Sequence, residues 1–387
     1  MSRTGKDTSF LIVSHSVTPG IAGDLRRYLL ETRCREFWYI THDFHSLETR
    51  RSHIEHYCIG NLVEKRFSPD YRFLPGPLVI LKDFVYTIAW MILRIRKVGV
   101  FIGLSGADTL CGILLKRITS TKHVIYYSID FIPKRFKNAW LNRMYHRLND
   151  YALRHSDEIW DLSPMMKEGR ESIRGLRPEQ LPEQRVVTRG IWADAKRYSS
   201  DEIDRTEMVF VGGLAEKMRL EVVLEAIPEI LRHIPTFKFR IIGKGPCEGI
   251  LKATAQRLGV ESSVIFEGFV PEDRVVAEKL GRAALAVALY DREKDDFTYY
   301  ADPAKIKIYM AAGLPIILTD LPHNATELAD SGCATIVECE PSSVARAVIE
   351  IMSDRELLED YRRNVAEYSS LLDWNRLLDD SLNRFRH

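Results

Sequence analysis

Three glycine turns each follow a short apolar run and open a segment with helical periodicity. The glycines are Gly20 and Gly23 in the first half of the chain, and Gly212, Gly213, Gly243 and Gly245 in the second. A glycine turn before a helix lets backbone N–H groups approach an anion closely, and the helix dipole favours that anion. None of the turns matches GxGxxG or a P-loop, and a single such turn is more often a plain tight turn. Two of them in one half of the chain favour an anion site.

A lysine near the start of a later helix adds a cation to this pattern. In DPAKIKIYMAAG (302–313), Asp302 is the predicted N-cap and Pro303 the first helical residue, so Lys305 lies in the first turn. A lysine is normally unfavourable there because the helix dipole is positive at that end. A bound phosphate would make a lysine at this position favourable, because its negative charge attracts both the ammonium group and the helix N-terminus. We therefore predict that Lys305 and the backbone N–H groups hold one diphosphate. The alternative is a solvated lysine. Lys307 is expected to point to solvent.

The order of apolar segments predicts two halves of the same kind. SFLIV (9–13), FWYITH, VGVFIG, HVIYYS and EIWDLS read as strands separated by helices, and after a polar linker at 191–207 the alternation restarts at MVFVGGL (208–214). Such alternation predicts parallel sheets, whose ligands lie outside the carboxyl ends of the strands. We therefore expect an α/β protein with two Rossmann-like domains, 1–195 and 205–368, whose sheets face each other across a cleft. A helical tail, 369–387, packs back on the first domain through Trp374.

Composition excludes several classes of function. The 387 residues are 45% hydrophobic and 28% charged, which is typical of a globular protein of two domains. A net charge of +1 gives no global attraction to nucleic acid, and no nucleic-acid-binding motif is present. The six cysteines form no CxxC, and no His/Cys cluster has metal-ligand spacing. We expect buried, reduced thiols in a cytoplasmic protein, and no bound metal.

Two segments bear on contact with membranes. FVYTIAWMIL (84–93) is shorter than the ~20 residues that span a bilayer, and the N-terminus lacks the apolar core of a signal peptide. We expect a chain that does not cross a membrane, with the apolar stretch 76–95 buried in the first domain. Residues 131–155 carry six Lys and Arg residues with interleaved aromatic residues, a pattern of helices on anionic membranes. The alternative is an ordinary helix with a solvated basic face and its aromatic residues in the core.

Three quoted segments carry a family resemblance. FVGGLAEKMRLEVVLEAIPEILRHIPTFKFRIIGKGP, VIFEGFVPEDRV and DPAKIKIYMAAGLPIILTD resemble, in order and spacing, the C-terminal half of the GT-B retaining glycosyltransferases of family 4. The first half resembles the same family more weakly, through the glycine loop at 18–23, YYSIDFIPKRF, HSDEIWDLS and VVTRGIWAD. The resemblance implies a nucleotide-sugar donor on the second domain and an acceptor on the first. It also implies transfer with retained anomeric configuration and without a required metal.

Family positions carry over only where this sequence matches them. Gly212 and Gly213 match the loop beside the donor diphosphate, where the family usually has an arginine in place of Gly213 and a lysine in place of Met218. Lys217 or Arg219 is then expected to supply the positive charge. Further matches lie near the nucleotide and its base: Gly243, Lys244 and Gly245, then Glu267, Gly268 and Phe269.

The family's paired glutamates would fall on Tyr300 and Ile308, and neither is acidic. Residues 299–320 thus keep the lysine and the backbone N–H groups that would hold a diphosphate. They lack the two carboxylates that the resemblance leads us to expect as contacts of the donor sugar and the ribose. Asp302 is a partial replacement, and Asp295, Asp296 and Tyr299 are further candidates. The remaining candidate donor contacts are Gly20, Tyr290, Pro303 and Ile306.

The catalytic candidates are Asp130, Lys217 and Lys305. Asp130 ends the strand of YYSIDF, where it would contact donor sugar or acceptor, or cap a helix. His15 and Ser16 are weaker candidates. The leading hypothesis is a retaining glycosyltransferase that acts on a glycan or lipid-linked acceptor at the cytoplasmic side of a membrane. The missing carboxylates argue for a rival, a non-catalytic partner protein with the same fold. A nucleotide-sugar epimerase is a second rival, but it would need a set of acid–base residues that the sequence does not show.

Overall fold

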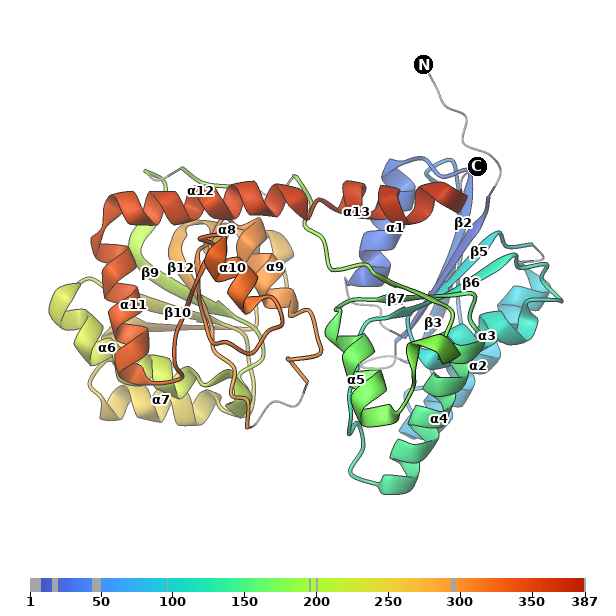
Figure 1. The fold of residues 1–387 in the computed structure, drawn as a ribbon, viewed down its shortest axis with the longest axis horizontal. Helices are drawn as coiled ribbons and strands as arrows, with labels where there is room; N and C mark the ends of the chain where they lie inside the picture. Colours follow the sequence, from blue (N-terminus) through green and yellow to red (C-terminus); the bar gives the residue numbers. More distant parts are fainter. Residues whose placement is uncertain are drawn as a thin grey trace, which may run out of the picture. The chain divides into compact units, whose positions relative to one another are not determined.

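The computed structural model describes residues 8–15, 20–43, 50–95, 97–194, 196–199, 201–293 and 297–385. The chain divides into two compact units (Figure 1). Unit 1 consists of Met1–Thr188 and Trp374–His387, and unit 2 consists of Arg189–Asp373. Among the described residues, no helix is long and apolar enough to cross a membrane.

Unit 1 is built on a sheet of eight strands in the order β4-β3-β2-β1-β5-β6-β7-β8. The strands are β1 Phe10–Ser14, β2 Glu36–His42, β3 Ser52–Cys58, β4 Asn61–Phe67, β5 Val100–Gly103, β6 His123–Ser128, β7 Glu158–Asp161 and β8 Glu183–Val186. All neighbouring pairs are parallel except β2–β3 and β3–β4. The antiparallel β3–β4 hairpin was not predicted. Its two-residue loop, Ile59–Gly60, has positive φ at both positions (50° and 79°), as the tight hairpin turn requires.

The helices of unit 1 are α1 Ile21–Glu31, α2 Gly76–Leu93, α3 Gly106–Leu115, α4 Ala139–His155, α5 Met165–Arg174 and α13 Trp374–Leu382. Helix α13 packs on α1, where the Tyr28 hydroxyl donates to Asp379. Trp374 is buried at the start of α13. The expectation that 76–95 is buried is wrong in part, because α2 leaves an apolar face exposed that includes Leu81, Val85 and Leu93.

Unit 2 is a six-stranded parallel sheet in the order β11-β10-β9-β12-β13-β14. Its strands are β9 Asp204–Val211, β10 Lys238–Ile242, β11 Val264–Gly268, β12 Ala283–Ala288, β13 Ile316–Leu318 and β14 Ala334–Ile336. Its helices are α6 Leu220–His233, α7 Glu248–Arg257, α8 Asp273–Gly281, α9 Ala304–Ala311, α10 Ala325–Asp330, α11 Pro341–Ser353 and α12 Arg355–Leu371. Strand β9 begins inside the stretch predicted to be a linker.

Helices cover both faces of this sheet (Figure 1), and the buried apolar residues form two clusters. One contains buried residues of α6, α7 and α11, and the other contains those of α9, α10 and α12. Strands β9, β10 and β11 follow one another from the centre of the sheet to one edge, and β12, β13 and β14 follow one another from the centre to the other edge. The strand order therefore reverses between β9 and β12, and ligands of such sheets bind at the carboxyl ends of strands beside this point.

Candidate anion-binding site

Two glycine turns of unit 2 lie directly against each other at the carboxyl ends of β9 and β10. Gly212 and Gly243 have φ of 142° and 141°, a conformation that residues with side chains rarely adopt. A Cβ on Gly243 would lie 1.9 Å from the Gly212 carbonyl oxygen, and one on Gly245 would lie 2.4 Å from that of Leu214. The Leu214 N–H donates to the Lys244 carbonyl oxygen (3.1 Å) and so joins the turns. Close approach of the two turns is therefore a structural reason for these glycines.

Gly213 differs from its neighbours because nothing near it requires a glycine. A Cβ there would meet no atom within 4 Å, and its φ lies outside the left-handed region. The residue is exposed. An arginine, the residue that the resemblance leads us to expect, would fit at this position.

Lys305 lies in the first turn of α9 and reaches the first glycine turn. Its Nζ lies 2.8 Å from the Met218 Sδ, 4.4 Å from the centre of the Phe210 ring and 5.3 Å from that of Tyr290. A Cβ on Gly212 would lie 3.7 Å from the Lys305 Nζ. Aromatic faces attract a cation. The ammonium group of Lys305 is thus held next to the Gly212 turn, the position that the predicted binding of a diphosphate by both would need. Helix α9 starts one residue later than predicted, with Pro303 as its N-cap.

Lys217 and Arg219 lie in the segment between the first glycine turn and α6. The Lys217 Nζ is 5.4 Å from the centre of the Phe297 ring. Arg219 is the N-cap of α6 with φ of 48°, and its guanidinium lies 3.1 Å from Glu221 and 3.6 Å from Asp291. Arg219 is therefore paired with two carboxylates, and Lys217 lies over the face of an aromatic ring. Both cations lie in the segment that follows the first glycine turn, so each stays a candidate for the second positive charge.

The base-pocket candidates at the carboxyl end of β11, Glu267, Gly268 and Phe269, lie in different surroundings. Glu267 is paired with Arg240 and Lys279, and the Lys279 ammonium above all holds the pKa of its carboxyl below the ordinary value. Gly268 accepts the Gly243 N–H at its carbonyl oxygen (2.8 Å) and has φ of 70°. The Phe269 ring is 69% exposed. Phe269 is thus available for stacking, whereas Glu267 is held in an ion-pair network.

Lys307 and Ile306 of α9, and Asp302 two residues before this helix, are more buried than the sequence indicated. Lys307 is buried, contrary to expectation, and its Nζ lies 3.3 Å from the Asp302 Oδ1. The other oxygen of Asp302 accepts the backbone N–H of Arg189 (3.0 Å). Asp302 is 4% exposed, so its contacts are with the protein interior. The Ile306 side chain is fully buried in the core, so only the backbone of this residue is left as a donor contact.

Three further candidates, Tyr299, Tyr300 and Ile308, lie at or near the surface. Ile308 is 42% exposed, and the half-buried Tyr300 meets Tyr299 edge to face. The Tyr290 side chain is buried, with its ring below Lys305, and its backbone N–H donates to the Thr319 hydroxyl (2.8 Å). Asp295 and Asp296 lie outside the described residues, as does Ser16.

The candidates of unit 1 lie at the carboxyl ends of β1 and β6. Gly20 is the N-cap of α1. Asp130 follows β6, is paired with Arg135 (3.1 Å) and lines a cavity of about 30 Å³. His15 follows β1, and its Nδ1 lies 2.5 Å from the buried Asp108. Burial acts to lower the pKa of His15, but Asp108 outweighs it and the pKa is raised. This partner could not be predicted from the sequence, because Asp108 belongs to α3, the helix after β5, far from His15 in the chain.

Both units are doubly wound α/β domains, and this pair defines the GT-B fold. Two solved structures show the same fold over nearly the whole chain. HepE of Anabaena, solved in complex with UDP, has a TM-score of 0.66 at 15% identity and covers 97% of this chain and 100% of its own. Sucrose-phosphate synthase of Thermosynechococcus elongatus has a TM-score of 0.69 at 13% identity and covers 98% of each chain. The GT-B fold predicted from the sequence is confirmed.

The second unit carries the family match. Residues 205–354 match the family model of glycosyl transferases group 1. A curated relative, the putative colanic acid biosynthesis glycosyltransferase WcaL of Salmonella typhimurium, is 25% identical over 161 residues. The match spans 41% of this chain and 39% of that relative.

Proposed function

We propose that the protein is a glycosyltransferase that binds a nucleoside diphosphate sugar on unit 2 and transfers the sugar to an acceptor on unit 1. One observation carries this proposal: Lys305 and two interlocked glycine turns meet at the carboxyl edge of β9 and β10, beside the point where the strand order reverses. The family match over residues 205–354 covers these three features.

The proposed chemistry is displacement of a diphosphate by an acceptor hydroxyl. The bond between the anomeric carbon and the diphosphate oxygen breaks, and the acceptor oxygen bonds to that carbon on the same face, so the configuration is retained. The hydroxyl proton passes to an oxygen of the departing phosphate. Lys305, Lys217 and the backbone N–H groups of the turns stabilise the leaving charge, and this step requires no metal ion. Asp130 contacts the transferred sugar or the acceptor.

The substrates are proposed from chemistry and from the relatives. HepE is described in complex with UDP, and we propose a uridine-based donor as the first to test. WcaL is described as a glycosyltransferase of colanic acid biosynthesis, and we propose a glycan or lipid-linked acceptor of a cell-surface polysaccharide. The reaction would take place at the cytoplasmic side of a membrane, with α4 in contact with its surface.

Donor binding is tested by thermal unfolding of the wild-type protein with UDP, GDP, ADP, TDP and their sugars. A ligand at 100 times its Kd stabilises the folded state by about 2.7 kcal/mol. Lys305→Ala should reduce the shift that the best nucleotide gives. Lys252→Ala, which removes a surface lysine of α7, should leave it unchanged. The proposal fails if no nucleotide stabilises the protein, or if Lys305→Ala responds like the control.

Transfer with retention is tested separately on the nucleotide sugar that binds. Proton NMR of the product in the first minutes of reaction shows its anomeric configuration before any mutarotation. The same configuration as the donor supports the proposed mechanism, and the opposite configuration overturns it. Tight donor binding without transfer to any acceptor would favour the non-catalytic partner instead.

A further inference from the structure

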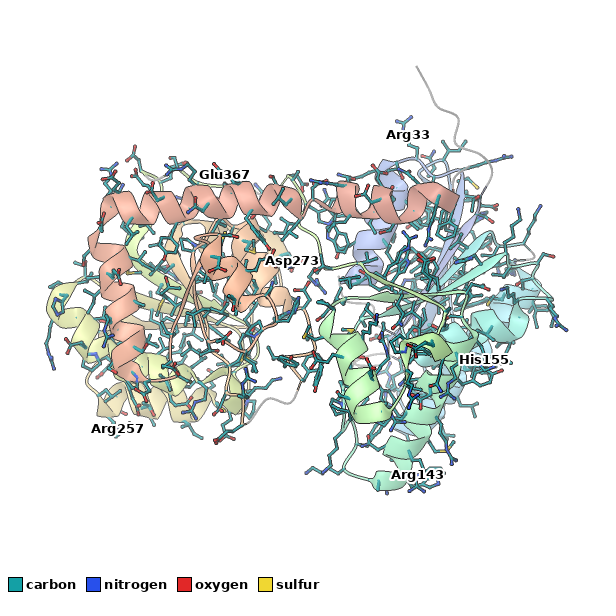
Figure 2. The ribbon with its side chains drawn as sticks, viewed as in Figure 1. Arg33, Arg143, His155, Arg257, Asp273 and Glu367 are labelled. Atoms are coloured by element: carbon teal, nitrogen blue, oxygen red, sulfur yellow. The ribbon has the colours of Figure 1, made fainter. Side chains whose placement is uncertain are left out.

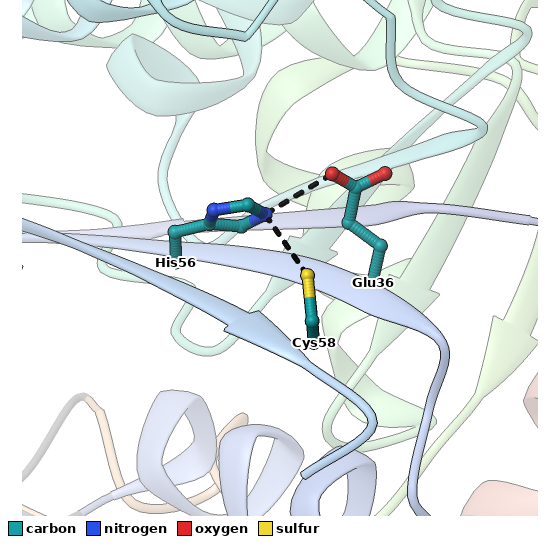
Figure 3. Close-up of side chains that lie close together, drawn as sticks. All are labelled: Glu36, His56 and Cys58. Carbon is teal, nitrogen blue, oxygen red and sulfur yellow. Dashed lines mark hydrogen bonds and ion pairs between the residues drawn. The ribbon is translucent and has the colours of Figure 1, made fainter. Parts of the chain in front are cut away.

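Three side chains of metal-ligand type meet on one face of the unit 1 sheet. Glu36 of β2 lies directly opposite Cys58 of β3, and His56 precedes Cys58 by two residues. Because side chains alternate along a strand, His56 and Cys58 point to the same face. The His56 Nε2 lies 3.0 Å from the Glu36 Oε1 and 3.6 Å from the Cys58 Sγ (Figure 3). One ligand atom from each residue lies within 4.8 Å of the other two.

The imidazole of this group is held in position by a neighbouring ring. Trp38, which faces His56 across β2 and β3, stacks on it with ring centres 3.7 Å apart and planes 4° apart. Trp38 is itself buried in the unit 1 core. The ring of His56 therefore cannot turn freely, and its Nε2 stays directed at Glu36 and Cys58. Fixed ligand orientation is a feature of metal sites, because supporting contacts set the direction of each donor atom.

We propose that Glu36, His56 and Cys58 bind one thiophilic divalent cation, with Zn²⁺ as the natural occupant. Bonds of about 2.0–2.3 Å in a tetrahedral zinc site place its ligand atoms roughly 3.3–3.7 Å apart. The distance of 3.6 Å between His56 and Cys58 already lies in this range, and that of 3.0 Å between His56 and Glu36 needs only a small side-chain shift to reach it. A thiolate and an imidazole favour Zn²⁺ over Mg²⁺ or Ca²⁺, which take oxygen ligands.

The group supplies three protein ligands, so a water molecule takes the fourth position. Access is provided by Glu36, whose side chain is 43% exposed. Binding replaces the Cys58 thiol proton, which is released to solvent. The bound ion joins β2 to β3 and so stabilises the edge of the sheet that ends in the β3–β4 hairpin. This role is separate from the proposed transfer reaction, whose diphosphate site lies in unit 2.

The sequence did not indicate this group. We found no His/Cys cluster with metal-ligand spacing, and we predicted no strand at 52–58. Glu36 is distant from His56 and Cys58 in the chain, and only the antiparallel β2–β3 pairing brings it to them. The expectation of no bound metal stays a prediction, which the experiment below tests.

Cobalt substitution tests the proposal on the full-length reduced protein after removal of metals by a chelator. Titration with Co²⁺ should give a thiolate-to-metal charge-transfer band and the strong visible absorption of four-coordinate Co²⁺, with saturation at one equivalent. Addition of Zn²⁺ should abolish both signals. Equilibrium dialysis should likewise find one bound Zn²⁺, and thermal unfolding should shift to higher temperature with Zn²⁺.

Two variants distinguish this site from other thiols. Cys58→Ser is nearly isosteric, and it should lose the charge-transfer band while its unfolding temperature without metal stays within a few degrees of the wild type. Cys247→Ser removes another half-buried cysteine and should behave like the wild type. His56→Gln should lower Zn²⁺ affinity at least tenfold. Absence of the band in the wild type, or its survival in Cys58→Ser, would overturn the proposal.

Discussion

The carbonyl oxygen of Gly212 occupies the place that a Cβ on Gly243 would take, with only 1.9 Å between them. Gly212 in turn donates its N–H to the carbonyl oxygen of Ile242, the residue before Gly243 (3.0 Å). The turn after β9 and the turn after β10 therefore form one unit. A change that moves one turn must therefore move the other.

Gly243→Ala should destabilise the protein strongly. The alanine would have to move the Gly212 carbonyl group and adopt a φ of 141°, so we expect a loss of at least about 2 kcal/mol in the free energy of unfolding. Chemical denaturation measures this loss. Gly249→Ala is the matched control, because a Cβ there meets no atom within 4 Å and the residue lies in α7. It should be neutral or stabilising by up to about 1 kcal/mol. Equal stability of the two variants would contradict the observed packing of the turns.

Gly213→Arg should strengthen nucleotide binding without loss of stability. The side chain would extend into open space beside the Gly212 turn, so the unfolding free energy without ligand should stay within about 0.5 kcal/mol of the wild type. A charge-assisted hydrogen bond to a phosphate contributes about 1.5–3 kcal/mol, equivalent to a decrease in Kd of roughly tenfold or more. Calorimetry with the nucleotide that stabilises the wild type measures the change.

The control for this variant is Gly213→Met, which adds a long side chain without charge. It should bind the nucleotide as the wild type does. If the arginine and methionine variants bind equally, then the phosphates do not lie beside Gly213, and the position of the proposed diphosphate site is wrong.

His42 should make unit 1 sensitive to acid. The imidazole is fully buried between the Ser52 and Thr87 hydroxyls, each 2.8 Å away. Burial lowers its pKa well below the ordinary value, and the charges of His15, Lys82 and His53 add to this effect. The unfolded chain therefore binds a proton at a higher pH than the folded one does, so the contribution of His42 to stability is present above about pH 6.5 and is lost as pH falls.

The comparison of His42→Gln with the wild type isolates this contribution, since other groups titrate in both proteins. At pH 7 the variant should be less stable by about 1–3 kcal/mol, because hydrogen bonds of a buried group are lost. Between pH 7 and pH 5 the difference should shrink, as the wild type alone loses stability through His42. Urea denaturation at several pH values measures both free energies. A constant or growing difference would show that His42 is not buried in its neutral form.

The sequence predicted the features that depend on local patterns. Gly212, Gly243 and Lys305 could be found because strand, turn and helix signals stand side by side in the chain, and parallel sheets align their carboxyl ends. The β3–β4 hairpin was missed because strand β4 lies at the sheet edge with mostly exposed residues, so NLVEKRF shows no apolar run. Asp302 also accepts a hydrogen bond from the backbone of Arg189, more than a hundred residues away, and a contact at that separation leaves no local pattern in the sequence.

Helix α4 should bind anionic membranes through its outer face. Trp140 and Met144 are 63% and 44% exposed, so these apolar side chains are not in the core as an ordinary basic helix would require. Arg143 is exposed near the N-terminal end of the same helix, at the bottom of Figure 2. Arg147 follows one turn later and is also exposed. An exposed apolar and basic face of this kind suits the headgroup region of an anionic bilayer.

Sedimentation with vesicles measures this binding. Wild-type protein should sediment with vesicles that contain phosphatidylglycerol and much less with pure phosphatidylcholine, and added salt should weaken the binding. A double variant, Trp140→Ala with Arg147→Glu, should lose most of the bound fraction. Ile250→Ala, which removes a 67% exposed side chain on α7, is the control and should bind as the wild type does. If the double variant still sediments fully, α4 is not the contact, and the exposed apolar face of α2 becomes the next segment to alter.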